Sequence, residues 1–307
     1  MTTLPLATAA FALYPETSVF DFDIQPLNLT PPFYVTLEAQ NDTPGFRAAA
    51  LAQALQHDMN PLHGCYGTNP FSMHPRTKET DAPLPACSPA PPLPQLPFDD
   101  NFTLIEHINP TGNVMMLVIK YEGELRLLKV FQQFDRYTVG KRKLLRFDTE
   151  KAAYEQLLHR GVCDIGIVPR CYGWVELKSE HMPMIEKQLH TDWDWDRNGL
   201  PKGLLLEYFA DAVPVSISNV TIFLAEKAMM ALCQIHAAFI KHNDIARRNC
   251  LLLPDGRVIW VDFDTCLFPD LGVRRVDFWE ELRIAWQFFY TCLLPNQRIG
   301  YHDPLVP

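Results

Sequence analysis

Three oxygen-bearing side chains in the second half of the chain, Asp244, Asn249 and Asp262, have the types and the spacing of a metal site. Asn249 precedes a short apolar run, and Asp262 follows a second one after the turn at 254–256. A hairpin of about ten residues would bring Asn249 and Asp262 side by side. Hard oxygen ligands that converge from separate elements suit Mg²⁺, which usually shares a substrate phosphate.

An acid, Glu150, falls on the otherwise apolar face of a helix predicted over residues 147–160. A buried carboxylate needs a partner, because leaving it unpaired costs several kcal/mol. Lys129 is the candidate, since its neighbours in the predicted strand 124–131 are apolar. The alternative, a solubilising lysine on an edge strand, has equal weight on these residues alone.

Further elements must position these side chains. Apolar runs bounded by turn residues predict strands, and apolar residues spaced three and four apart predict a long helix over 221–241. The predicted strands cover residues 102–107, 114–121, 124–131, 203–209, 250–253 and 258–261.

Six segments, taken in order, resemble the motifs of the protein kinase-like superfamily. HNDIARRNCLL resembles the catalytic loop H-R-D-x-x-x-x-N, and VDFD resembles the D-F-G metal motif at the right spacing. Residues 126–130 resemble the V-A-I-K strand, and the pattern that starts at Glu150 fits helix C. Residues 206–209 resemble the gatekeeper and hinge, and residues 112–114 the end of the glycine-rich loop.

The resemblance is greatest to the compact fungal protein-kinase-like proteins, which are similar to aminoglycoside and choline kinases. It implies an α+β, two-lobed kinase-like fold. The N-lobe, an antiparallel sheet with helix C, would cover residues 98–209 with the hinge. A reduced, mainly helical C-lobe would cover residues 210–307.

The resemblance also implies ATP as substrate, Mg²⁺ as cofactor and a hydroxyl acceptor. Phosphoryl transfer depends on positioning and on neutralising developing charge. Lys129 would hold the α- and β-phosphates while Glu150 fixes its rotamer, and Asp244 would accept or orient the acceptor's proton. Arg248 would neutralise the γ-phosphate or brace the loop. The implied metal ligands are Asn249 and Asp262, with Asp264 as a third carboxylate.

Adenine would pair with the backbone C=O of Glu207 and the backbone N–H of Phe209, by the same resemblance. The remaining nucleotide-binding residues would be Gly112, Val114, Leu127 and Leu251.

Several positions depart from the kinase pattern. His107 and Asn109 stand where the first two loop glycines belong, and only Gly112 remains. Because glycine lets backbone N–H groups approach phosphate closely, their loss should weaken the grip on nucleotide. Asp264 replaces the motif glycine and either adds a metal ligand or tolerates the turn.

The segment after this motif is short. Residues 265–276 form a connector without an A-P-E sequence, so regulation by an activation segment is not expected. Residues 277–279 resemble the start of helix F, with Asp277 tying down the catalytic loop.

Residues 1–97 form a proline-rich, acidic extension. Of the 26 prolines, 16 fall in the first 100 residues, where three basic residues face ten acidic ones. Residues 83–97 are predicted to form a polyproline-II linker, and one short helix is predicted at 46–57. The PxxP spacings could dock an SH3- or WW-type partner, but a stiff spacer is the favoured interpretation.

The overall composition narrows the function further. A net charge of −9 argues against nucleic-acid or membrane partners. Eight scattered cysteines without a CxxC pair are typical of reduced thiols in an intracellular protein, cytoplasmic or nuclear. Residues 141–143, Lys-Arg-Lys, could be a nuclear address or phosphate patch, although a solvated lead-in to helix C is favoured.

Two functions remain. The leading one is an ATP- and Mg²⁺-dependent phosphotransferase, because all five polar roles keep their residue types. The alternative is a pseudokinase, a nucleotide-binding or scaffolding module whose proline-rich tail recruits partners. The degraded glycine loop and the shortened C-lobe favour this alternative.

Overall fold

The computed structural model describes residues 71, 78, 81–84, 89–99, 102–109, 114–132, 136–181, 183, 185 and 200–299. Gly112 and the helix predicted at 46–57 lie outside these residues. The chain divides into two compact units. The sheet unit consists of Ser88–Asp211 and Val261–Cys266, and the helical unit holds Ala212–Trp260, Leu267–Pro307 and the chain up to Cys87.

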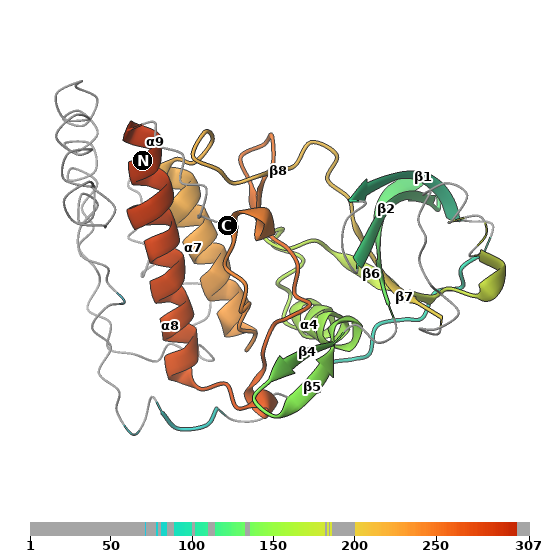
Figure 1. The fold of residues 1–307 in the computed structure, drawn as a ribbon, viewed down its shortest axis with the longest axis horizontal. Helices are drawn as coiled ribbons and strands as arrows, with labels where there is room; N and C mark the ends of the chain where they lie inside the picture. The colour runs from blue at the N-terminus through green and yellow to red at the C-terminus, as the bar shows by residue number, and fades with distance from the viewer. Residues whose placement is uncertain are drawn as a thin grey trace. The chain divides into compact units, whose positions relative to one another are not determined.

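The sheet unit is built on five antiparallel strands in the order β1-β2-β3-β7-β6 (Figure 1). They are β1 (Phe102–Asn109), β2 (Val114–Tyr121), β3 (Glu124–Phe131), β6 (Cys171–Glu176) and β7 (Lys202–Glu207). The three strands and the hairpin predicted in residues 102–131 are confirmed. Because β3 is the central strand, the edge-strand interpretation of Lys129 is wrong.

The helix α4 (Arg146–His159) belongs to the sheet unit and differs from the prediction by one residue at each end. Its buried residues include Phe147, Glu150, Tyr154 and Leu157, the face that the sequence predicts. The mixture of an antiparallel sheet with helices confirms the α+β class.

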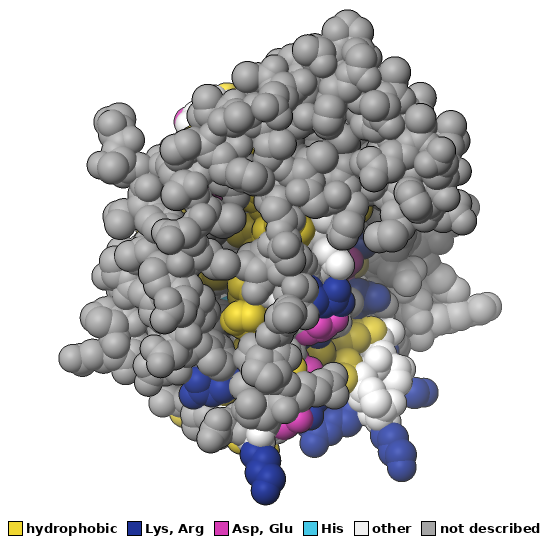
Figure 2. Space-filling model, turned by 90° about the vertical axis from the view of Figure 1, so that its left-hand side faces the viewer, with side chains coloured by type: hydrophobic (Ala, Val, Ile, Leu, Met, Phe, Trp, Pro, Cys, Tyr) yellow, Lys and Arg dark blue, Asp and Glu magenta, His cyan; other side chains and the backbone are white. Residues whose placement is uncertain are grey.

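A two-stranded hairpin that the sequence did not predict precedes α4. It pairs β4 (Arg136–Val139) with β5 (Arg142–Leu145). Residues 141–143 form its turn and the start of β5, and their side chains are exposed. Figure 2 shows Lys and Arg side chains that project from the lower edge of one face of the molecule. The basic run is therefore solvated, as favoured, but it lies in a hairpin.

Part of the predicted linker packs on the sheet unit as an added strand. The backbone N–H of Leu96 donates to the Trp174 carbonyl at 2.8 Å, and the Trp174 N–H donates to the Pro94 carbonyl at 3.0 Å. The N–H of Leu93, whose side chain is buried, donates to Glu155 Oε1 at 2.8 Å. We call residues 93–96 the strap. It extends the sheet beyond β6, so the packed unit begins about ten residues before the predicted boundary at Phe98.

The helical unit combines a small sheet with helices. Its elements are β8 (Val213–Pro214), α7 (Ile222–Ala237), η2 (Arg247–Asn249), β9 (Cys250–Leu252), β10 (Val258–Trp260), η3 (Pro269–Leu271), α8 (Arg275–Trp286), the π-helical η4 (Gln287–Leu293) and α9 (Leu294–Ile299). The strands pair in the order β10-β9-β8, and α7 packs beside α8 (Figure 1). In the described part of the chain, none of the helices combines the length and apolar character needed to span a membrane.

The helix predicted over 221–241 ends at Ala237. Phe239 has a φ of 63°, which turns the chain out of the helix. The backbone of Lys241 then exchanges two hydrogen bonds with Leu267, at 2.8 and 2.9 Å. A tertiary pairing thus overrides a helical pattern, and it frees the residues that follow to form a loop.

Buried cysteines are part of both cores. Cys163, Cys171 and Cys250 are buried, and burial raises the pKa of each thiol. A thiol with a raised pKa is a poor nucleophile. These three cysteines fit the packing role that the sequence predicts.

Candidate functional site

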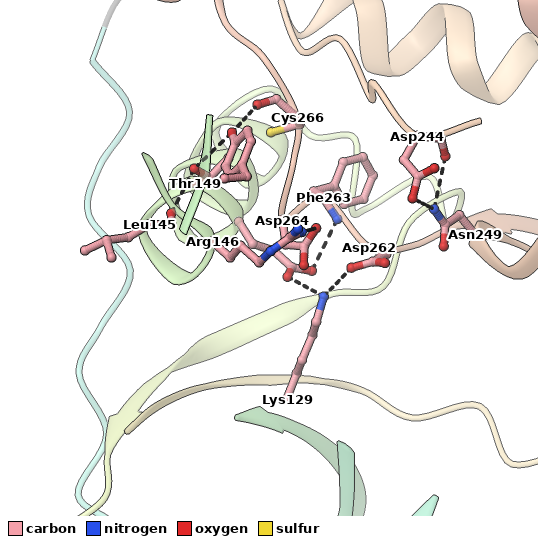
Figure 3. Close-up of polar contacts among 12 residues, drawn as sticks. Lys129, Leu145, Arg146, Thr149, Asp244, Asn249, Asp262, Phe263, Asp264 and Cys266 are labelled. Atoms are coloured by element: carbon pink, nitrogen blue, oxygen red, sulfur yellow. Dashed lines mark hydrogen bonds and ion pairs between the residues drawn. The ribbon is translucent and has the colours of Figure 1, made fainter. Parts of the chain in front are cut away.

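Lys129 lies in the middle of β3 and is only 5% exposed. Its ammonium Nζ donates to Glu150 Oε2 and to Asp262 Oδ1, both at 2.5 Å (Figure 3). Burial alone would lower the pKa of Lys129, but the carboxylates of Asp262 and Glu150 outweigh it and raise the pKa well above its usual value. The sequence-predicted pairing with Glu150 is confirmed, and the lysine is charged.

Glu150 is fully buried on α4, one helical turn after Arg146. Its second oxygen, Oε1, accepts the backbone N–H of Phe263 at 3.4 Å. Burial raises the pKa of Glu150 to about 7; Asp262 and Asp264 add to this rise, and Lys129 opposes it. Glu150 therefore joins the helix both to β3 and to the residues after β10.

Asp262 adopts a left-handed backbone with a φ of 70°, two residues beyond the end of β10. This conformation costs a non-glycine residue of order 1–3 kcal/mol and is concentrated at functional sites. The Asp262 side chain remains partly exposed while it binds Lys129. The strained position thus presents a carboxylate that contacts both the buried lysine and solvent.

Asp264, the residue in place of the motif glycine, is buried and binds a cation. Its Oδ1 accepts Arg146 Nη1 at 2.9 Å, from the first residue of α4. Burial raises the pKa of Asp264, and Lys129 and Arg146 oppose that rise. The sequence left two interpretations of Asp264, a metal ligand or a tolerant turn residue. The structure adds a third, in which Asp264 is an ion-pair partner of α4.

We call Lys129, Arg146, Glu150, Asp262 and Asp264 the lysine cluster. It holds three carboxylates and two cations, so one negative charge is in excess when all are ionised. Such a cluster attracts a further cation. If one carboxylate moves away from Lys129, the lysine still has the other as a partner. Among the described residues, no group of three or more His, Cys, Asp or Glu is arranged to hold a metal ion.

A second group, in the helical unit, consists of Asp244, Arg248 and Asn249, and we call it the loop cluster. Asp244 Oδ2 accepts from Arg248 Nη2 at 2.7 Å. It also accepts from Asn249 Nδ2 at 2.8 Å (Figure 3). Asn249 Nδ2 also donates to the Asp244 carbonyl at 3.0 Å. The amide nitrogen is thereby turned toward Asp244, and the amide oxygen faces the other way. The Asp244 side chain is 32% exposed and that of Arg248 is 60% exposed.

Glu281 of α8 holds the start of this loop. Its carboxylate accepts the backbone N–H of His242 at 2.9 Å and that of Asn243 at 2.5 Å, and it lies 2.7 Å from His236 Nε2. Burial alone would raise the pKa of Glu281, but the bonds from His236 and the loop outweigh it and lower the pKa.

The sequence predicts that Asp277 holds this loop, and that prediction is wrong. Asp277 Oδ2 instead accepts the backbone N–H of Arg274 at 2.7 Å and caps the start of α8. The residue that binds the loop comes one turn later, at Glu281.

The residues expected around adenine occupy both units. Val114 begins β2, Leu127 lies in β3 and Glu207 ends β7, so these three belong to one sheet. The predicted strand over 203–209 ends at Glu207, before Phe209. Leu251 lies in β9 of the helical unit.

The end of β1 also bears on the nucleotide prediction. Where the first two loop glycines were expected, β1 continues as a strand to Asn109, with an irregular register between His107 and Asn109. A paired backbone there has fewer N–H groups to offer a phosphate, which agrees with the weakened grip that the sequence predicts.

Three side chains that the sequence did not single out belong to the site: Arg146, Tyr137 and Glu281. Arg146 stands four residues before Glu150, a spacing that puts both on one helix face and could have signalled it. Glu281 carries no local signal, because its partners are backbone N–H groups about 40 residues earlier.

No protein-family model matches this chain, and no curated protein matches it either. The function is therefore argued from the two clusters.

Proposed function

We propose that this protein is an ATP- and Mg²⁺-dependent phosphotransferase that moves the γ-phosphate of ATP to a hydroxyl acceptor. The observation that carries the proposal is the lysine cluster. A buried, charged lysine on a central strand is shared by a helix carboxylate, Glu150, and by a second carboxylate, Asp262, in a strained turn.

The cluster can exchange partners when nucleotide arrives. Glu150 is fully buried and keeps Lys129 in place, whereas the Asp262 side chain is partly exposed. A phosphate oxygen of ATP could replace Asp262 on the Lys129 ammonium, because both are anionic acceptors. Asp262 would then be available for a metal cation, which also removes the excess negative charge of the cluster.

The donor set fits Mg²⁺. Asp262 and Asn249 would hold it, since a carboxylate and an amide oxygen are the hard ligands that this ion prefers. Cys250 pairs with Trp260, so Asn249 and Asp262 stand one and two residues beyond the same pair of the β9–β10 hairpin. When bound, Mg²⁺ would neutralise charge on the transferring phosphate.

The loop cluster has the groups needed to bind and deprotonate a hydroxyl acceptor. Asp244 has a carboxylate that is fixed by Asn249 and Arg248 yet remains open to solvent. It can accept a hydrogen bond from an incoming hydroxyl and take its proton. Arg248, which is largely exposed, adds a positive charge beside that carboxylate for the transferred phosphate.

The test replaces Asp244 by asparagine. Asp244→Asn keeps an oxygen acceptor for Arg248 and Asn249, so ATP binding should be retained. Turnover of γ-labelled ATP should fall by about 10²–10⁴, the usual contribution of a general base. Acceptors of three classes, protein hydroxyls, small alcohols and water, are compared. Asp255→Asn, in an exposed turn, is the control; equal turnover in wild type and Asp244→Asn contradicts the assignment.

A specific observation favours the rival, a pseudokinase scaffold. Lys129 already has two carboxylate partners and Asp264 has Arg146, so every member of the lysine cluster is ion-paired in the absence of nucleotide. Thermal unfolding with ATP separates the two functions, because a ligand of the native state raises stability by mass action. Stabilisation that requires Mg²⁺ supports the enzyme, and no shift with any nucleotide supports the scaffold.

A further inference from the structure

The first two turns of α4 are bonded to the segment after β10 at two points. Arg146 Nη1 binds Asp264 Oδ1 at 2.9 Å, and Glu150 Oε1 accepts the Phe263 N–H at 3.4 Å. Arg146 and Glu150 are four residues apart, so both bonds leave the same face of the helix. Two attachments along one face restrict the rotation of α4 about its axis. They also fix the distance between α4 and residues 263–264.

Tyr137 of β4 covers this junction. Its hydroxyl donates to the Cys266 carbonyl at 3.0 Å and lies 3.3 Å from Thr149 Oγ1. The Arg146 guanidinium is 5.6 Å from the centre of the Tyr137 ring, within range of a cation–π contact. Burial raises the pKa of Tyr137 to about 12, so its hydroxyl stays protonated and able to donate. The unpredicted hairpin therefore supplies, through Tyr137, the cover of the ion pair.

Asp264 depends on this pair for its charge balance. It is buried in the same cluster as two other carboxylates, Glu150 and Asp262, which both bind Lys129. Removing Arg146 takes one of the two cations of the lysine cluster away from its three carboxylates. Repulsion would then act between α4, which carries Glu150, and the segment that carries Asp262 and Asp264.

We propose that the Arg146–Asp264 ion pair, covered by Tyr137, is a lock that holds α4 against residues 262–266, and that Arg146 is a positioning residue for Lys129. The inference rests on the proposed function, because it assigns the control of the same lysine. In the locked state Glu150 lies where it binds Lys129, and the ammonium is aimed for phosphate. Opening the lock would withdraw Glu150 and leave Lys129 without its buried partner.

The experiment measures the helix and the nucleotide separately, on the full chain. Amide hydrogen exchange over residues 150–159 is followed without nucleotide in wild type, Arg146→Ala, Asp264→Asn and the double variant. Exchange should quicken roughly tenfold in each single variant, and the double variant should add little, because coupled residues act as one. Arg257→Ala, which breaks an exposed ion pair in the helical unit, is the control and should leave α4 unchanged.

Nucleotide measurements supply the second readout. In Arg146→Ala, the turnover number should fall roughly tenfold while the KM for the acceptor stays close to wild type, and Arg146→Lys should restore part of it. Unchanged exchange over α4, or additive effects in the double variant, overturns the lock. If wild type binds no nucleotide, the proposed function fails, and the exchange data alone then decide whether the lock exists.

Discussion

The lysine cluster and the loop cluster handle buried charge in opposite ways. In the lysine cluster, carboxylates outnumber cations, and burial raises the pKa of Glu150 and of Asp264. In the loop, the carboxylate of Asp244 is partly exposed, and Glu281, the buried acid that binds the loop, has a lowered pKa because His236 and the loop backbone outweigh the effect of burial. The first arrangement is poised to gain a cation, and the second is a fixed support.

The largest effect is expected at Glu281, the buried acid that holds the loop. Glu281→Ala leaves His236 and two loop N–H groups without their acceptor. Breaking a buried pair in this way should lower the free energy of unfolding by about 3–5 kcal/mol, measured by urea titration. Glu280→Ala, next to it, breaks an exposed ion pair with Arg283 and should cost less than about 1 kcal/mol. Similar losses in the two variants would deny Glu281 its anchoring role.

Glu150 of the lysine cluster and Glu281, which binds the loop, should also respond to pH with opposite signs. The pKa of Glu150 rises on folding from 4.5 to about 7, so the folded state binds its proton more tightly. Its contribution to stability is present below pH 4.5 and is lost as pH rises to about 7, by roughly 2–3 kcal/mol. Glu281, with its lowered pKa, contributes stability that is lost only as pH falls below its usual range.

Glu150→Gln sharpens this contrast. The variant should show a smaller decline of unfolding free energy between pH 4.5 and 7 than wild type, measured by urea titration at several pH values. Part of the decline should remain, because burial also raises the pKa of Asp264. An identical slope in both proteins would mean that Glu150 is charged throughout this range.

A smaller effect is expected at the strap, which supports α4 from outside the cluster through Glu155. A Cβ at Gly173 would lie 2.6 Å from the Pro94 carbonyl oxygen, at a φ of 154°. Gly173→Ala should therefore lower the free energy of unfolding by about 2 kcal/mol. Gly123→Ala, at a φ of 89° with open space, isolates the backbone cost of about 1 kcal/mol. Equal thermal shifts in the two variants would show that the strap can move aside freely.

Two members of the lysine cluster could be predicted, because each is a charged residue within a local apolar pattern. Glu150 interrupts an apolar helix face and Lys129 interrupts an apolar strand. Because a buried charge needs a partner of opposite sign, the two residues are predicted to pair. Arg146 and Asp264 were not paired in advance, because both positions have ordinary solvated alternatives and their contact spans more than a hundred residues.

The helical unit was harder to predict. The apolar spacing continues to 241, but the helix ends at Ala237, where Phe239 turns and Lys241 pairs with Leu267. Glu281 likewise acts on backbone groups, and a backbone N–H leaves no mark in the sequence. Asp244 and Asn249, both named from the motif, are joined by a hydrogen bond in the structure, but the motif does not reveal what holds their loop.

The strap has a practical consequence for anyone who prepares a shorter protein. The sheet order ends at β6, whose outward backbone groups would otherwise be open to pairing with another chain. A fragment that starts at Phe98, the boundary suggested by proline content, would lose the segment that closes this edge and would empty the place of Leu93. Such a fragment should self-associate through β6, so a shortened protein is best started ahead of residue 89.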